Sequence, residues 1–265
     1  MIRTNLGYDS FKKRFPQKQT LYDIFSLAIN KVTTIDEIVK SQYPQFLEFI
    51  DEIKNLYYEY QKFKQKNFML DYDDLLLKLK ELLERDEEFR RYMNKTFKYV
   101  MVDEYQDTNK LQAEIIKLLS GTTRNIMVVG DDSQSIYSFR GANFKNIIDF
   151  PKDFPDAKII LIEENYRSTQ AILNFTNQII ASMKEKYPKI LYTKNEFGEL
   201  PYIIAAQNTN LESKFVVDKI LELREEGIPL QDIAVLFRSG YMSYDLEIEL
   251  NKANIPYRKF GGIKF

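Results

Sequence analysis

The stretch that decides the fold is YVMVDEYQDTN, which occupies residues 99–109. Its apolar first half breaks abruptly into polar residues at Asp103, a pattern typical of a buried strand that runs into a reactive loop. A second stretch, MVVGDDSQSIYSFRG at residues 127–141, has the same form. Since ligands of open α/β sheets bind beyond the carboxyl ends of the strands, we expect both loops to carry functional residues.

Predicted strands and helices alternate from residue 97 onward. The predicted strands are 99–102, 126–129, 158–162, 202–205, 233–237 and 257–260. The predicted helices begin near Asn109, at 171 and at 211. Asn109 has capping-box spacing to Gln112, and Ser168 or Thr169 is expected to cap the second helix. Strands separated by helices favour a mostly parallel sheet, and so an α/β fold.

Residues 1–66 are helical in pattern, with apolar side chains at helical spacing over 20–29 and 46–58. A further helix starts with the three acids Asp71, Asp73 and Asp74. These acids can cap the helix or hold a metal ion, and capping is favoured because acids at a helix start need no ion. The lysines at positions 62, 64 and 66 are expected to form a solvated helix face.

The composition excludes several kinds of catalytic and metal-binding site. The 265 residues contain no cysteine and no histidine, which excludes disulfides, thiolate catalysis and the usual zinc ligands. Acid–base work falls to carboxylates, lysine or tyrosine. A formal net charge of −1 gives no global attraction to nucleic acid, so such a surface must be a local patch or an aromatic platform. No apolar run reaches the length of a membrane span, and a cytoplasmic protein is expected.

The two loops together favour phosphoryl transfer. Asp103 and Glu104 lie where the first strand should end, and paired carboxylates there suit a divalent cation and an attacking water. In the second loop, Gln134 can orient water or contact a phosphate, and Arg140 can neutralise charge on a transferred phosphoryl group. No Gly-x-x-x-x-Gly-Lys-Ser/Thr phosphate loop occurs in the sequence.

Two further features have a structural and a functional interpretation. Tyr137 and Phe139 can be core residues, but in a polar loop beside an arginine they also suit base stacking. Arg167 lies between a predicted strand end and a helix N-terminus, where anions bind. Its structural alternative is a surface salt bridge.

Taken together, the segments resemble the UvrD/Rep/PcrA-type superfamily 1 DNA helicases. DEYQDTN (103–109) is similar to that family's Walker B motif, VGDDSQSIYSFRGA (129–142) to its third motif and ENYRS (164–168) to its fourth. LDYDDLL (70–76), IAVLFRS (233–239) and IPYRKFGGIKF (255–265) extend the match. The resemblance covers residues 65–265 firmly and 1–64 loosely.

The resemblance implies an ATP site that uses Mg²⁺. Asp103 would hold the metal together with Glu104, and Glu104 would also activate the hydrolytic water. Gln134 would sense the γ-phosphate and couple it to DNA. Arg140 would contact the γ-phosphate, as would the residues of the fourth motif described next.

In that fourth motif, Tyr166 would stack on the adenine or ribose, and Arg167 would act as an arginine finger from the second motor domain. The resemblance also implies a DNA surface. Tyr137 and Phe139 would lie along the single strand. The family often has tryptophan where Phe139 stands, and phenylalanine keeps a stacking face of smaller area. Two residues of the 233–239 segment, Arg238 and Ser239, would lie near the DNA backbone.

For the fold, the resemblance implies RecA-like parallel sheets flanked by helices, with an N-terminal all-helical segment. Residues 1–64 would be a remnant of subdomain 1B, 65–155 the second half of motor domain 1A, and 156–265 the first part of motor domain 2A. The prolines in 151–156 mark the predicted boundary.

The first functional hypothesis is a fragment of an ATP-dependent DNA helicase with 3′ to 5′ polarity. Its expected partners are single-stranded and duplex DNA and, beyond these, repair or replication proteins, with no membrane. One alternative is the motor of a helicase–nuclease. Another is a non-catalytic nucleic-acid-binding relict of the fold. Because the phosphate loop is absent from these residues, the chain by itself is expected to be inactive.

Overall fold

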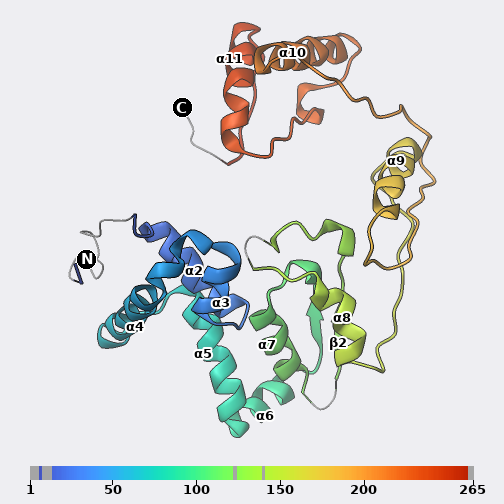
Figure 1. Ribbon diagram of the computed structural model, residues 1–265. Coiled ribbons are helices and arrows are strands. Elements are labelled where there is room, and N and C mark those ends of the chain that lie inside the picture. Colours follow the sequence, from blue (N-terminus) through green and yellow to red (C-terminus); the bar gives the residue numbers. More distant parts are fainter. Residues whose placement is uncertain (1–5, 8–13, 122–123, 139–140, 262–265) are drawn as a thin grey trace. The chain divides into compact units, whose positions relative to one another are not determined.

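A computed structural model describes residues 6–7, 14–121, 124–138 and 141–261 (Figure 1). The chain divides into two compact units, Met1–Phe197 and Gly198–Phe265. The described residues are mostly helical, and they include a small parallel sheet. In the described part of the chain, no helix combines the length and the apolar character that crossing a bilayer requires.

The first unit begins with helices that build their own core. They are α2 (Lys18–Asn30), α3 (Ile35–Gln42), the 3₁₀ turn η2 (Pro44–Phe49) and α4 (Ile50–Lys66). Apolar residues three or four apart face inward, so that side chains such as Ile24, Val39 and Ile53 are fully buried. The two helices predicted here are confirmed. The second one begins as a 3₁₀ turn with proline in its first turn, where the missing N–H does no harm.

The next three helices pack side by side (Figure 1). They are α5 (Tyr72–Arg85), α6 (Glu87–Thr96) and α7 (Lys110–Ser120), and Leu83 and Leu111 fill the space between α5 and α7. The capping box predicted for Asn109 and Gln112 at the start of α7 is confirmed, with bonds of 2.8 and 3.0 Å.

The start of α5 confirms the predicted cap and corrects one prediction. Asp71 accepts the N–H of Asp74 at 2.9 Å, and Asp74 accepts that of Asp71 at 3.0 Å. The carboxylates also accept the Lys64 ammonium, at 2.6 Å each. The expected solvated lysine face is therefore wrong for Lys64, whose side chain is 6% exposed, because two helix-capping acids draw it inward. Lys62 does face solvent, with 53% of its side chain exposed.

The sheet consists of β1 (Val100–Val102) and β2 (Ile126–Val128), paired in parallel with Val100 opposite Ile126. One face packs against α8 (Lys145–Asp153) through a cluster that includes Tyr105 and Phe150. The first two predicted strands are confirmed, although each is shorter than predicted at one end.

The other predicted strands are not formed among the described residues. Segments 158–162, 202–205, 233–237 and 257–260 have no strand assignment. A strand exists only where a neighbour completes its hydrogen-bond ladder, and these segments have none among the described residues. Their apolar side chains stay exposed as a result, for example Ile162 at 72%, Ile203 at 89% and Leu236 at 93%. The large parallel sheet expected from the alternation is reduced to two strands.

A turn at 164–168 precedes α9 (Gln170–Ala181). Thr169 occupies the N-cap position, as expected, but its side chain does not cap the helix. The first amides of the helix are accepted by backbone carbonyls instead, the N–H of Gln170 by Glu196 at 3.4 Å and that of Ala171 by Phe197 at 2.9 Å. In the turn before the helix, the side-chain oxygen of Asn165 accepts the N–H groups of Arg167 and Ser168 at 2.9 and 2.8 Å. Asn165 is favoured because its short carboxamide bonds amides two and three residues ahead.

The second unit is built on α10 (Thr209–Glu225) and α11 (Tyr244–Lys252), with the 3₁₀ turns η6 (Leu230–Asp232) and η7 (Gly240–Ser243) between them. Its core includes Val217, Leu246 and Ile255. The predicted helix end at Gly227 is confirmed, since this glycine follows α10 with a φ of +96° that other residues rarely adopt.

Candidate nucleotide and DNA site

The loop after β1 turns sharply at Glu104. This residue has φ +50° and ψ +42°, a left-handed conformation that costs a non-glycine residue roughly 1–2 kcal/mol. Its N–H donates to Asp103 Oδ1 at 2.9 Å, and the chain then enters the 3₁₀ turn η3 (Tyr105–Asp107). The two carboxylates are thus presented, exposed, at the end of β1, whose own residues are only partly buried. Strained residues held by their surroundings cluster at functional sites.

Gln106 joins the two loops that the sequence singled out. Its side chain is almost fully buried. Its Nε2 donates to Glu104 Oε2 at 2.6 Å, and its Oε1 accepts the N–H of Asp131 at 2.9 Å. One amide therefore orients the Glu104 carboxylate and fixes it to the loop after β2. The sequence pattern includes Gln106 but gives no sign of its partner Asp131, which lies 25 positions away.

Gly130 makes this close approach possible. A Cβ atom at position 130 would lie 2.4 Å from Gln106 Oε1 and 2.8 Å from Ile147 Cδ1. Both distances are shorter than any normal contact, so only glycine fits between the loop and the buried amide.

The loop after β2 is organised around Asp131. Ser133 donates to Asp131 Oδ1 through its N–H and its hydroxyl, and Gln134 Nε2 donates to Oδ2 at 2.9 Å. Burial alone would raise the pKa of Asp131, but hydrogen bonds from Lys189, Ser133 and Gln134 outweigh it and lower the pKa to about 2. Asp131 is therefore an anchor for Gln134 and stays ionised at neutral pH.

A small cavity of about 250 Å³ lies beside η3 and is lined by Asp107, Asn109, Tyr137 and Ala142. Tyr137 is 38% exposed and so is not a core residue. Asp107 Oδ1 is buried without a hydrogen-bond partner among the described residues. Burial, together with the nearby charge of Glu104, raises the pKa of Asp107.

Asn109 is held from a second direction by a buried chain of amides. Its Nδ2 donates to Asn30 Oδ1 at 2.7 Å, and Asn30 Nδ2 donates to Asp73 Oδ1 at 2.8 Å. The helical segment at the start of the chain is thereby bonded to the loop that follows β1. Neither Asn30 nor Asp73 was predicted to contribute to this region, because their partners are remote in sequence.

The remaining predicted residues are less closely connected. Tyr166 is 78% exposed. Arg167 is exposed too, and no ion pair joins it to any residue that the structure describes, so the salt-bridge alternative is not supported. Arg238 and Ser239 belong to the second compact unit, whereas the other predicted site residues belong to the first. Phe139 and Arg140 lie outside the described residues.

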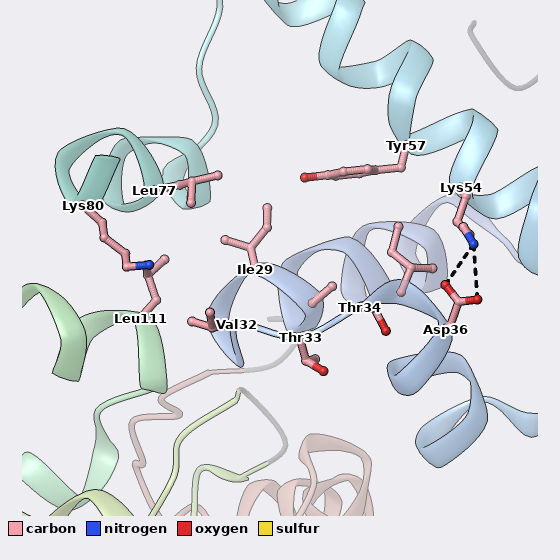
Figure 2. Close-up of a pocket in the computed structure, with 12 residues that line it drawn as sticks. Ile29, Val32, Thr33, Thr34, Asp36, Lys54, Tyr57, Leu77, Lys80 and Leu111 are labelled. Carbon is pink, nitrogen blue, oxygen red and sulfur yellow. Dashed lines mark hydrogen bonds and ion pairs between the residues drawn. The ribbon is translucent and has the colours of Figure 1, made fainter. Parts of the chain in front are cut away.

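A larger cavity, about 520 Å³, contains none of these residues. Figure 2 shows Ile29, Tyr57 and Leu77 around it, contributed by α2, α4 and α5. Lys54 at its edge is already paired with Asp36 at 3.1 Å. Its apolar lining and paired charge offer no groups suited to phosphate chemistry.

Mg²⁺ binding can be tested against the chemistry of these side chains. Asp103 and Glu104 offer only oxygen donors and are exposed. Mg²⁺ keeps several waters and is often bound through one or two carboxylates plus substrate phosphates. The residues present fit such an ion.

Two family profiles match the chain. One, described as the UvrD/REP helicase N-terminal domain, matches residues 5–155, and the other, the UvrD-like helicase C-terminal domain, matches residues 160–265. Among curated relatives, the ATP-dependent DNA helicase PcrA of Staphylococcus aureus is 42% identical over 213 residues, and that of Staphylococcus epidermidis is 41% identical over the same length. Each match covers 80% of this chain and 29% of the relative.

Proposed function

The chain belongs to the UvrD/REP helicase family, and on that basis we propose that it contributes half of the ATP site and part of the DNA track of an ATP-dependent DNA helicase. The observation that carries this proposal is the Gln106 amide, which joins Glu104 to the loop of Asp131. Two loops that are remote in sequence are thereby held as one unit. The relatives bear the name ATP-dependent DNA helicase, which supports the same activity here.

In this proposal Asp103 holds Mg²⁺ together with Glu104 and the phosphates of ATP. The ion, when bound, neutralises charge on the β- and γ-phosphates. Glu104 takes a proton from the attacking water, and Gln106 keeps its carboxylate in a fixed orientation for that transfer. A base must lie within hydrogen-bond reach of the proton that it removes, and in this proposal the 2.6 Å bond from Gln106 keeps the Glu104 carboxylate in place for that contact.

Four other side chains complete the proposed ATP chemistry. Gln134 contacts the γ-phosphate from its place beside Asp131. Arg140 and Arg167 neutralise charge on the transferred group, with Arg167 acting as the arginine finger. Tyr166 stacks on the adenine or the ribose. The exposure of Tyr166 and the absence of an ion pair at Arg167 with any described residue leave both side chains available for these roles.

The proposed DNA track begins at Tyr137 and Phe139 and continues with Arg238 and Ser239. Stacking on aromatic side chains binds single strands with little base preference. Tyr137 is partly exposed in the loop that also carries Gln134, so a nucleotide-dependent movement of that loop would move the stacking surface. The proposal includes 3′ to 5′ translocation, a role in DNA repair, and a cytoplasmic location.

The proposed fold of the working enzyme has RecA-like sheets, with 1–64 as part of subdomain 1B, 65–155 in motor domain 1A and 156–265 in motor domain 2A. The exposed apolar side chains of 158–162 and 202–205 support strands whose neighbours lie outside the described residues. The two profiles, which match 5–155 and 160–265, support a boundary between the motor domains in this region.

The test uses the full-length protein, by which we mean the gene product that contains these residues. ATP hydrolysis is measured with Mg²⁺, with and without single-stranded DNA, and strand separation is measured on duplexes with a 3′ or a 5′ tail. We expect DNA-stimulated hydrolysis and unwinding of the 3′-tailed duplex. Hydrolysis that DNA does not stimulate would contradict the proposal, and unwinding of only the 5′-tailed duplex would contradict the polarity.

A further inference from the structure

Lys189 lies in the segment 187–192, which contacts the loop after β2. Its side chain is 11% exposed, and its Nζ lies 2.5 Å from Asp131 Oδ1 and 2.5 Å from Asp132 Oδ1. Asp132 is almost completely buried, with 1% of its side chain exposed. Two adjacent carboxylates, one of them out of contact with water, need a cation at this point, since an unpaired buried charge is strongly destabilising.

The same segment holds the second oxygen of Asp132. The N–H of Tyr187 donates to Asp132 Oδ2 at 2.9 Å, and the Tyr187 hydroxyl donates to the carbonyl of Ile147 in α8 at 3.0 Å. Tyr187 and Lys189 therefore bond the two oxygens of the Asp132 carboxylate, one each. The segment belongs to the region matched by the C-terminal domain profile, and the loop to the region matched by the N-terminal one.

Directly after Lys189 the chain is bonded to the strand-like residues that lead into the 164–168 turn. The N–H of Ile190 donates to Glu163 Oε1 at 2.8 Å. The N–H of Tyr192 donates to the carbonyl of Glu163 at 3.0 Å, and the N–H of Asn165 donates to the carbonyl of Tyr192 at 2.7 Å. Asn165 in turn fixes the backbone of Arg167.

On the other side of Lys189, Asp131 receives Gln134 Nε2 on the oxygen that Lys189 does not contact. The carboxylate is thus shared between the lysine and the glutamine. A displacement of Lys189 would leave two neighbouring negative charges at 131 and 132, and the loop would have to move to bring them to water.

We propose that Lys189 is a positioning residue that ties the Gln134 loop to the Arg167 turn, so that the two groups reach the γ-phosphate together. This inference rests on the proposed ATPase function and adds to it a contact that sets the relative placement of the two loops. Lys189 touches no substrate in this account. It acts through Asp131 on one side and through the bonded segment 190–192 on the other.

The test is a mutant cycle in the full-length protein, since coupling between residues is measured only by comparing single and double variants. DNA-stimulated ATP turnover and ATP affinity are measured for Lys189→Met, Gln134→Ala and the double variant. We expect Lys189→Met to reduce kcat about tenfold with little change in ATP affinity. In the Gln134→Ala background the same change should have almost no further effect. Lys189→Arg should restore most of the activity.

Two further variants distinguish a positioning role of Lys189 from a purely stabilising one. Lys184→Met, at an exposed lysine shortly before the segment 187–192, should behave like the wild type. Lys189→Met combined with Asp132→Asn removes the buried unpaired charge and should still be slow, because the tie is still missing. If this double variant regains full activity, or if the losses of Lys189→Met and Gln134→Ala multiply, Lys189 only stabilises the fold and the proposal is wrong. A wild-type protein without DNA-stimulated hydrolysis would instead refute the proposed function.

Discussion

At the scale of single residues, Gly130 and Gln106 show how little space the site allows. The Cβ of alanine at position 130 would lie 2.4 Å from Gln106 Oε1. We expect Gly130→Ala to destabilise the protein by about 1–3 kcal/mol, the usual effect of overpacking. It should also slow ATP turnover, because the new methyl group would displace the Gln106 side chain and break its hydrogen bond to Glu104 or to Asp131. Urea unfolding and a turnover assay check this.

A useful comparison is Gly227→Ala, where no atom lies within 4 Å of the new Cβ and only the φ of +96° is unfavourable. That change should reduce stability without reducing turnover of the remaining folded protein. Normal turnover in Gly130→Ala would show that Gln106 is not needed to hold Glu104.

Arg167 gives a second prediction at this scale. Arg167→Ala in the full-length protein should reduce turnover far more than ATP binding, because an arginine finger acts on charge in the transition state, with effects on the order of a thousandfold. Turnover and equilibrium ATP binding are measured side by side. Equal losses in the two quantities would make Arg167 a binding or structural residue.

Residue chemistry was predictable from the sequence where it depended on neighbours in the chain. The placement of Asp103 and Glu104 at a strand end, the helix cap at Asp71 and the capping box at Asn109 all follow from spacings of a few positions. The bonds that join Gln106 and Lys189 to Asp131 were not predictable, because each connects residues at least 25 positions apart. Such contacts are set by tertiary packing, which a local pattern does not encode.

At the scale of elements, the junction of α4 and α5 depends on one buried ammonium. Burial would lower the pKa of Lys64, but its bonds to Asp71 and Asp74 outweigh this effect and raise it. We expect Lys64→Met to destabilise the protein by about 3–5 kcal/mol, because it leaves buried carboxylates unpaired. Urea unfolding at neutral pH measures the change.

The matched control is Lys62→Met on the same helix. Lys62 pairs with Glu59 at 3.1 Å, but more than half of its side chain is exposed, and exposed ion pairs contribute only about 0–1 kcal/mol. If both variants lose similar stability, the buried network around Lys64 is not what holds α5 to α4.

The strands show which part of the fold could not be predicted from the sequence. The apolar runs 99–102 and 126–129 are strands because each supplies the other's hydrogen bonds. The run at 158–162 is also mostly apolar, but it has no strand neighbour among the described residues. Strand formation is a property of pairs of segments, so the pattern of one segment cannot establish it.

At the scale of the whole molecule, the chain has two compact units and spans 29% of the length of its PcrA relatives. Its residues include Asp103 and Glu104, the carboxylates that we propose to hold Mg²⁺, but no phosphate-loop motif. Because phosphoryl transfer depends mainly on positioning, we expect residues 1–265 alone to hydrolyse no ATP. Phosphate release from this purified chain above that of its Glu104→Gln variant would contradict the expectation.

The central claim is that Glu104, held by Gln106 at 2.6 Å, is the base of a DNA-stimulated ATPase. The most direct test is ATP binding and single-turnover hydrolysis by the full-length Glu104→Gln variant on single-stranded DNA. The substitution keeps the shape of the side chain and removes its ability to accept a proton. We predict nearly unchanged ATP binding and a hydrolysis rate lower by a factor on the order of 100 or more. A near-normal rate would contradict it and place the base at another residue.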